Sequence, residues 1–238
     1  MDIILIPGFW LNGDSWGTIP ERLRDAGHTV HALTLPGLDS VDTDRTGISM
    51  RDHVSFVVDF VDSLAAPVVL AGHSGGGAVA YAAADLRPDA VARIVYIDSG
   101  PLALGDSVND ELPIVDGEIP LPDWEVLGEE SLVDMTPSLR SHFRSIAVPE
   151  PIGPAYDKQQ LTSDRRFSIP STVICCEMPA SVFRELIEQG HPYVAELGRA
   201  TNYELVDLPT GHWPQFTKPE ELAVVIQAAV APAASSAS

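Results

Sequence analysis

The chain has 238 residues, with 34 acidic and 14 basic side chains and a formal net charge of −20. This length suits one domain with a sizeable core, and 45% hydrophobic against 20% charged residues excludes an intrinsically disordered protein. Because phosphate neutralisation requires clustered lysine and arginine, so acidic a chain is not expected to bind nucleic acid or an anionic membrane surface.

Short apolar runs alternate with amphipathic stretches, a pattern typical of parallel strands joined by helices. The predicted strands are 3–6, 29–34, 67–71, 91–97, 172–176 and 203–208. The predicted helices are 16–26, 49–64, 75–86, 181–197 and 220–230. The clearest helix begins at Ser49, and Asp52 three residues later can complete a capping box.

The interval between Ser99 and Pro170 breaks this rhythm, since it is rich in proline and has no confident strand. Loops of this length are usually functional or disordered, and its aromatic residues favour packing. We expect residues 101–170 to form a cap over a site, inserted into a core made of residues 1–100 and 171–230. The alternative is a surface excursion without function. The Ala- and Ser-rich tail, 231–238, is expected to be disordered.

Two adjacent cysteines, Cys175 and Cys176, cannot form a disulfide framework, and their apolar setting predicts a buried strand. The apolar stretch before Pro7 is too short for a signal peptide. No run approaches the roughly 18 apolar residues of a membrane span. We therefore expect a cytoplasmic protein, whose oligomeric state the sequence leaves open.

The strongest local motif is Gly72-His73-Ser74-Gly75-Gly76, between a predicted strand and a predicted helix. This is G-x-S-x-G in the strand–turn–helix context of a nucleophile elbow. The sharp turn needs glycines on both sides of Ser74 because neighbouring Cβ atoms would clash. The alternative is a tight turn without chemistry. His73 is expected to pack or to shape the loop.

Three segments together resemble the α/β-hydrolase family. Ile6–Trp10 resembles its first oxyanion loop, 72–76 its elbow, and Leu208–Trp213 its catalytic-histidine loop, with His212 lying 138 residues after Ser74. The stretch 9–76 is most similar to the plant methylesterase and hydroxynitrile-lyase branch. The resemblance implies a mostly parallel sheet with helices on both faces and a cap inserted between the sixth and seventh family strands. The family's first two strands are missing, so the sheet would begin at Ile3.

The resemblance also implies roles for the motif residues. Ser74 would be the nucleophile and His212 its general base, and the backbone N–H groups of Phe9 and Gly75 would form the oxyanion hole. The tryptophans expected to line the substrate pocket are Trp10, Trp124 and Trp213.

The acid of the catalytic triad is where the chain departs from the family. The usual position, just after strand 172–176, reads Glu177-Met178-Pro179-Ala180 and has no aspartate. Asp98, at the end of strand 91–97, is the favoured acid, Glu177 is the alternative, and a Ser–His dyad is the third possibility. Asp207 is expected to be structural.

The predicted function is a serine esterase that cleaves a small or medium ester or thioester through an acyl-enzyme, with no cofactor. No two histidines have metal-ligand spacing, so no metal is expected. The expected partner is a small-molecule substrate, neutral or cationic rather than anionic. The alternatives are a ligand-binding pseudoenzyme, or a lyase or carbon–carbon hydrolase that uses the same residues.

Overall fold

Six parallel strands form one sheet in a computed structural model that describes residues 1–65 and 67–231. The order across the sheet is β2-β1-β3-β4-β5-β6, and every neighbouring pair is parallel. The strands are β1 (Asp2–Ile6), β2 (Thr29–Ala32), β3 (Val68–His73), β4 (Val91–Ile97), β5 (Ser171–Cys175) and β6 (Tyr203–Asp207). All six predicted strands are confirmed within about two residues, whereas the predicted disorder of 232–238 lies outside the described residues.

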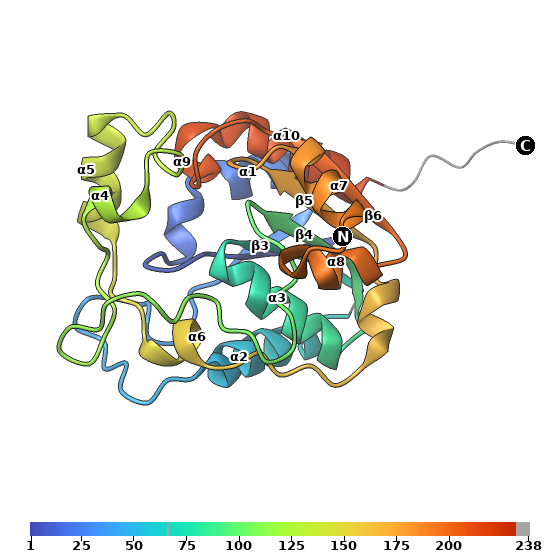
Figure 1. The fold of residues 1–238 in the computed structure, drawn as a ribbon, viewed down its shortest axis with the longest axis horizontal. Helices are drawn as coiled ribbons and strands as arrows, with labels where there is room; N and C mark the ends of the chain where they lie inside the picture. Colours follow the sequence, from blue (N-terminus) through green and yellow to red (C-terminus); the bar gives the residue numbers. More distant parts are fainter. Residues whose placement is uncertain (66, 232–238) are drawn as a thin grey trace, which may run out of the picture.

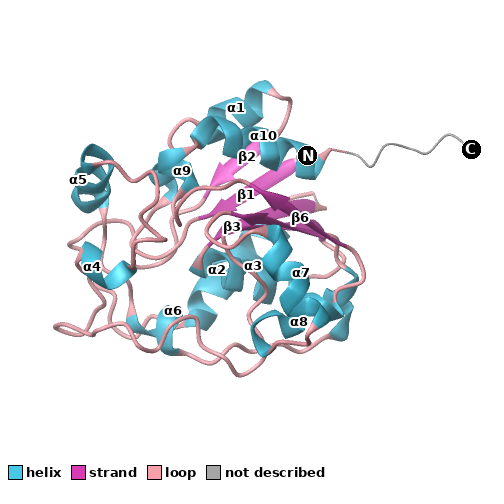
Figure 2. Cartoon of the chain, turned by 45° about the horizontal axis from the view of Figure 1, so that its top comes forward, coloured by secondary structure: helices cyan, strands magenta, loops and turns pink. Residues whose placement is uncertain are grey.

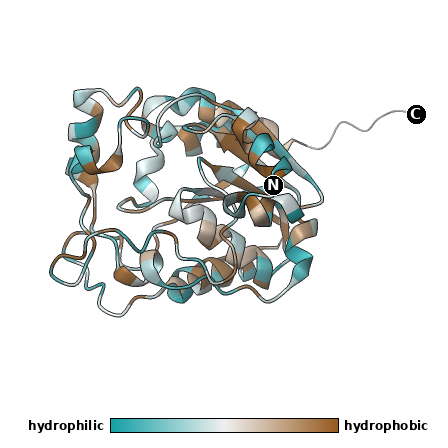
Figure 3. Ribbon diagram, viewed as in Figure 1, coloured by the Kyte–Doolittle hydropathy of each residue, from teal (hydrophilic) through white to brown (hydrophobic). Residues whose placement is uncertain are grey.

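Helices cover both faces of the sheet (Figure 2). One face carries α1 (Ile19–Asp25) and α10 (Pro219–Val230). The other carries α2 (Met50–Asp62), α3 (Gly75–Leu86), α7 (Ala180–Glu188) and α8 (Ala195–Arg199). Successive side chains of β1 alternate between the two layers, with Ile3 and Leu5 on the first face and Ile4 and Ile6 on the second. Because both faces are covered, the central strands are largely apolar, as the brown parts of the sheet in Figure 3 show, whereas the edge strand β6 also contains Glu204 and Asp207.

Two predicted helices are wrong in their extent. Within the stretch 16–26 only Ile19–Asp25 is helical, as α1, because Trp16 ends a 3₁₀ turn, η1 (Gly13–Trp16), and Gly17 after it takes a φ of 53°. The stretch 181–197 divides into α7, η3 (Pro192–Val194) and α8, because Gly190 has a φ of 65° and a proline follows. By contrast, α2 begins with the predicted capping box between Ser49 and Asp52.

The joining segment, residues 101–170 between β4 and β5, contains short helices rather than strands. They are α4 (Trp124–Leu127), α5 (Pro137–Ile146), α6 (Ile152–Tyr156) and η2 (Asp164–Ser168), and α4 and α5 stand together at one end of the molecule (Figure 1). Phe143 of this segment packs in one apolar cluster with Trp10 and Trp213 from the loops of the core. The joining segment is therefore packed onto the loops at the carboxyl ends of the strands.

Two sequence predictions concern single features of the fold. Cys175 and Cys176 are both buried and free, as their apolar setting predicts. Among the described residues, no helix has the length and apolar character needed to cross a membrane.

Candidate active site

Ser74 occupies the sharp turn between β3 and α3. Its backbone has φ 51° and ψ −124°, which is a strained conformation for a residue with a side chain. A Cβ on Gly72 would lie 2.4 Å from the carbonyl oxygen of Gly76, and a Cβ on Gly76 would lie 2.5 Å from that of Ile6. The glycines on either side of Ser74 are thus required by close backbone packing, as the motif predicts.

His212 lies in the loop between β6 and α9 (Pro214–Thr217), beside Ser74. Its Nε2 atom is 2.8 Å from Ser74 Oγ. Three hydrogen bonds hold the backbone of this loop. The Gly211 N–H donates to Val133 O at 3.1 Å, the His212 N–H donates to Ser131 O at 2.9 Å, and His73 Nε2 donates to His212 O at 2.6 Å. The joining segment and His73 together therefore determine where the imidazole lies.

Two carboxylates meet at the other imidazole nitrogen of His212. Asp98 Oδ2 is 2.6 Å from Nδ1, and Glu177 Oε2 is 3.1 Å from the same atom. The other oxygen of Asp98 accepts the backbone N–H groups of Cys176 and Glu177 at 3.1 and 3.0 Å. The other carboxylate oxygen of Glu177, Oε1, accepts a hydrogen bond from the Ser131 hydroxyl at 2.5 Å. Both residues left open as the acid are therefore in contact with the histidine, whereas Asp207 accepts the Ala180 N–H at the start of α7.

Burial and these carboxylates act in opposite directions on the titration of His212. Burial lowers its pKa, but hydrogen bonds and charge from Asp98 and Glu177 outweigh burial and raise the pKa to about 9. Burial raises the pKa of Asp98. Burial also acts to raise the pKa of Glu177, but hydrogen bonds with His212 and Ser131 bring it below its usual range. His73 stays neutral because burial lowers its pKa to about 3.

The loop after β1 lies directly against the serine. A Cβ on Gly8 would lie 2.9 Å from Ser74 Cβ, and a Cβ on Gly75 would lie 2.6 Å from the ring of Phe9. Gly75 is the first residue of α3, where backbone N–H groups have no acceptor within the helix. The loop after β1 and the start of α3 are therefore packed against each other beside Ser74, with the Phe9 ring against Gly75.

Trp10 anchors this loop to the joining segment. Its φ is 64°, its backbone N–H donates to a carboxylate oxygen of the buried Glu150 at 3.1 Å, and its indole N–H donates to Ile119 O at 3.0 Å. Its carbonyl accepts the Val148 N–H at 2.9 Å. The contributions of Glu150 and Ser131 have no signal in the sequence, because both residues reach the site only through contacts across the folded chain.

Two hollows open on either side of Ser74 and His212. Lobe A, about 330 Å³, is lined on its apolar side by Leu102, Val108, Phe183, Tyr193 and Leu197. Lobe B, about 410 Å³, is lined by Phe9, Trp10, Leu112, Leu127 and Trp213. Of the three tryptophans predicted to line the pocket, Trp10 and Trp213 line lobe B. Trp124 lines neither lobe. The Trp124 indole instead packs on Phe143 beneath the guanidinium of Arg144.

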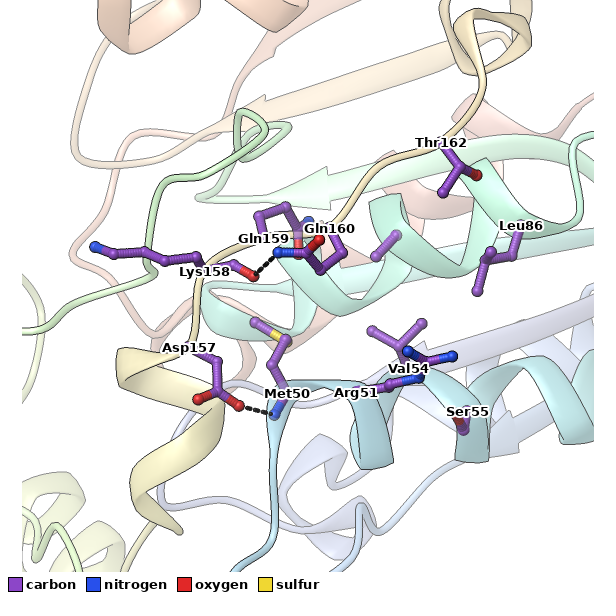
Figure 4. Close-up of a pocket in the computed structure, with 11 residues that line it drawn as sticks. Met50, Arg51, Val54, Ser55, Leu86, Asp157, Lys158, Gln159, Gln160 and Thr162 are labelled. Carbon is purple, nitrogen blue, oxygen red and sulfur yellow. Dashed lines mark hydrogen bonds between the residues drawn. The ribbon is translucent and has the colours of Figure 1, made fainter.

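A third cavity, of about 420 Å³, is separate from this site. It lies between α2 and α3, and Met50, Val54 and Leu86 form part of its wall (Figure 4). Its lining contains neither Ser74 nor His212, so it takes no part in the arrangement described above.

One group among the described residues offers three possible metal ligands within 4.8 Å of one another, namely Asp98, Glu177 and His212. In a serine–histidine site the Nδ1 proton of the imidazole lies between these groups. His212 Nδ1 would therefore have to lose this proton before the three side chains could bind a cation together.

Comparison with known proteins decides the family. The model of the alpha/beta hydrolase family matches residues 3–225. The chain belongs to the alpha/beta hydrolase family. A solved extracellular alpha/beta-hydrolase from a Paenibacillus species has the same fold, with a TM-score of 0.76 at 23% identity over 96% of this chain and 98% of that one.

Curated relatives of the chain are named as hydrolases and esterases. The pyrethroid hydrolase of Sphingobium wenxiniae is 27% identical over 94% of this chain and 86% of the relative. Methylesterase 7 of Arabidopsis thaliana is 32% identical over 40% of this chain and 38% of the relative. These relatives confirm the predicted enzyme class, an esterase-like hydrolase, and the predicted likeness to the plant methylesterase branch.

Proposed function

We propose that the chain hydrolyses carboxylic esters through an acyl-enzyme on Ser74, with His212 as general base and Asp98 as the triad acid. The observation that carries this proposal is the continuous contact from Ser74 Oγ through the His212 ring to Asp98, at 2.8 and 2.6 Å. Asp98 is favoured as the acid because its side chain is only 8% exposed and two backbone N–H groups hold it in place.

The reaction proceeds in two acyl transfers. His212 Nε2 takes the hydroxyl proton of Ser74 while Oγ attacks the ester carbonyl, and the imidazolium then gives that proton to the departing alcohol. Water repeats the sequence on the acyl-enzyme, which releases the carboxylic acid and restores Ser74. The N–H groups of Phe9 and Gly75 stabilise the oxyanion, and each such donor is worth roughly 3–4 kcal/mol in the transition state.

The two lobes support an uncharged substrate with an apolar group on each side of the ester. Both lobes reach Ser74 and His212, and among the described residues neither is lined by lysine or arginine. Asp106 and Glu196 line lobe A, and Glu111 and Glu177 line lobe B. A substrate carboxylate would therefore meet like charge from these acidic side chains and no lysine or arginine to offset it. Because the Sphingobium relative is named a pyrethroid hydrolase, pyrethroid esters are suitable test substrates.

The test is turnover of a series of p-nitrophenyl esters by the wild-type protein and by Ser74→Ala. Ser145→Ala is the matched control, because this exposed serine bonds only within its own helix end. We expect ester hydrolysis that Ser74→Ala abolishes and Ser145→Ala leaves unchanged. Hydrolysis that survives in Ser74→Ala, or no hydrolysis of any neutral ester by the wild type, would contradict the proposed function.

A further inference from the structure

The second carboxylate on His212 is the feature that the proposed triad does not use. Glu177 Oε2 lies 3.1 Å from Nδ1, although Asp98 already occupies that nitrogen at 2.6 Å. Glu177 stands in the loop after β5, and its side chain is 27% exposed. Its other oxygen accepts the hydroxyl of Ser131, which belongs to the joining segment and not to the core.

Ser131 also contacts the histidine loop directly. Its carbonyl accepts the His212 backbone N–H at 2.9 Å, so one residue holds both His212 and a carboxylate that faces His212. Two residues further on, Val133 O accepts the Gly211 N–H at 3.1 Å, and Asp134 accepts the Thr210 hydroxyl at 3.1 Å. The turn 131–134 therefore forms hydrogen bonds with three successive residues of the histidine loop, 210–212.

We propose that Glu177 is a positioning residue for His212, and that Ser131 holds it in that role, so that the docking of the joining segment sets the protonation of the catalytic histidine. This inference rests on the proposed function, since it concerns the same site. Asp98 fixes the ring from the buried side, whereas Glu177 adds a second negative charge that depends on one hydroxyl of the joining segment.

The charges around the imidazole favour this assignment. Asp98 comes from the end of β4 and Glu177 from the end of β5, and both face Nδ1. His73 at the end of β3 has its ring 5.0 Å from that of His212 and is held neutral by burial, which lowers its pKa. Other titratable groups near the pair are Tyr193 beside both carboxylates, Cys175 near Asp98, Cys176, Lys218 near Cys176 and Asp134 on the docked turn.

A second carboxylate has a predictable effect on the pH profile. The two carboxylates raise the pKa of His212 to about 9, so most of the free enzyme has a protonated imidazole at pH 7. Activity therefore rises with pH well above 6.5 and reaches its plateau in alkaline solution. Removal of Glu177 lowers the pKa of His212 and increases the neutral fraction at pH 7.

The experiment compares kcat/KM for p-nitrophenyl acetate across the neutral to alkaline range in wild type, Glu177→Gln, Ser131→Ala and Asp98→Asn. Glu129→Gln, an exposed acid just before the same turn, is the matched control. Rates are normalised to the active sites titrated with a fluorophosphonate.

We expect Glu177→Gln to move the midpoint of the profile to lower pH, to raise activity at pH 7 and to lower the alkaline plateau by no more than about tenfold. Ser131→Ala should move the midpoint in the same direction by less, and Glu129→Gln should not move it. An unchanged midpoint in Glu177→Gln would overturn the proposal. A plateau that falls as far as that of Asp98→Asn would also overturn it, because Glu177 would then be the triad acid.

A measurement without turnover keeps this test independent of the proposed function. The titration of the His212 imidazole is followed by NMR through its Cε1–H resonance in wild type and in Glu177→Gln. A lower midpoint in the variant supports the positioning role, and equal midpoints overturn it. If the midpoints differ but no variant and no wild-type protein cleaves an ester, the proposed function fails while the positioning role stands.

Discussion

Gly211→Ala tests whether the contact between the joining segment and the histidine loop positions the base. A Cβ at residue 211 would lie 2.3 Å from Ser131 O and 2.7 Å from Val133 O. Both contacts are with backbone, so the turn and the loop must separate by roughly 1 Å to reach van der Waals distance. The φ of Gly211 is not positive, so alanine introduces no backbone strain, and the effect on the folded state is steric.

The separation weakens two hydrogen bonds, from Gly211 N–H to Val133 O and from His212 N–H to Ser131 O. At about 0.5–1.5 kcal/mol each, their loss costs about 1–3 kcal/mol. Alanine also restricts the unfolded chain, which offsets about 0.4–1 kcal/mol of this loss. For a domain of this size we expect the melting temperature to fall by about 2–4 °C for each kcal/mol lost. Because a displacement of about 1 Å in a catalytic group can cost about 10²-fold in rate, kcat should fall by that order.

The assay pairs a thermal melt with kcat and KM for a p-nitrophenyl ester. Gly198→Ala is the matched control, because its Cβ would meet only Ile187 at an ordinary 3.8 Å. If Gly211→Ala has the kcat and melting temperature of the Gly198→Ala control, then the joining segment does not hold the histidine loop in the way described.

Three further predictions follow from the geometry. Asp98→Asn should lower kcat by about 10⁴-fold with little change in KM, by analogy with loss of the triad acid in serine proteases. An equally small loss of kcat in Asp98→Asn and in Glu177→Gln would contradict the assignment of Asp98 as the acid. Phe143→Ala should lower the unfolding free energy measured in urea by about 3–5 kcal/mol, because this fully buried ring of α5 packs on Trp213. A decrease smaller than that of an ordinary surface variant would show that the joining segment is not packed on the core through Phe143. Burial lowers the pKa of His53 to about 4, so near pH 6.5 the unfolded chain gains a proton that the folded protein does not. The unfolding free energy should therefore decrease as the pH falls from about 6.5 towards 4. His53→Gln should make this decrease less steep, and an unaltered slope would contradict the assignment of the effect to His53.

The strands and the elbow could be predicted because their causes are local. A strand buried on both faces is apolar throughout, and a serine in a strained turn needs glycine on either side. The division of the predicted helix 181–197 could not be predicted from periodicity, because the hydrophobic pattern continues across Gly190 and Pro192, where the chain turns. Short helices in the joining segment also give too few turns for a period to be visible.

The acid could be narrowed to two residues but not to one. Strands β4 and β5 are parallel neighbours, with Ile97 paired to Ile174, so Asp98 and Glu177 emerge at the same edge of the sheet. Both side chains can therefore reach one imidazole, and the choice depends on contacts made by residues far away in the sequence. Ser131 is 46 residues from Glu177, and no periodicity or motif connects the two.

The central claim is that Ser74 is a nucleophile activated by His212, and covalent labelling tests it most directly. The protein is incubated with a fluorophosphonate at neutral and at alkaline pH, and the adduct is located by mass spectrometry of the digested chain. We predict one adduct per chain on the peptide that contains Ser74, formed faster at alkaline pH and absent in Ser74→Ala and His212→Ala. A wild-type protein that takes up no label at either pH, or that takes it up on another residue, would contradict the account.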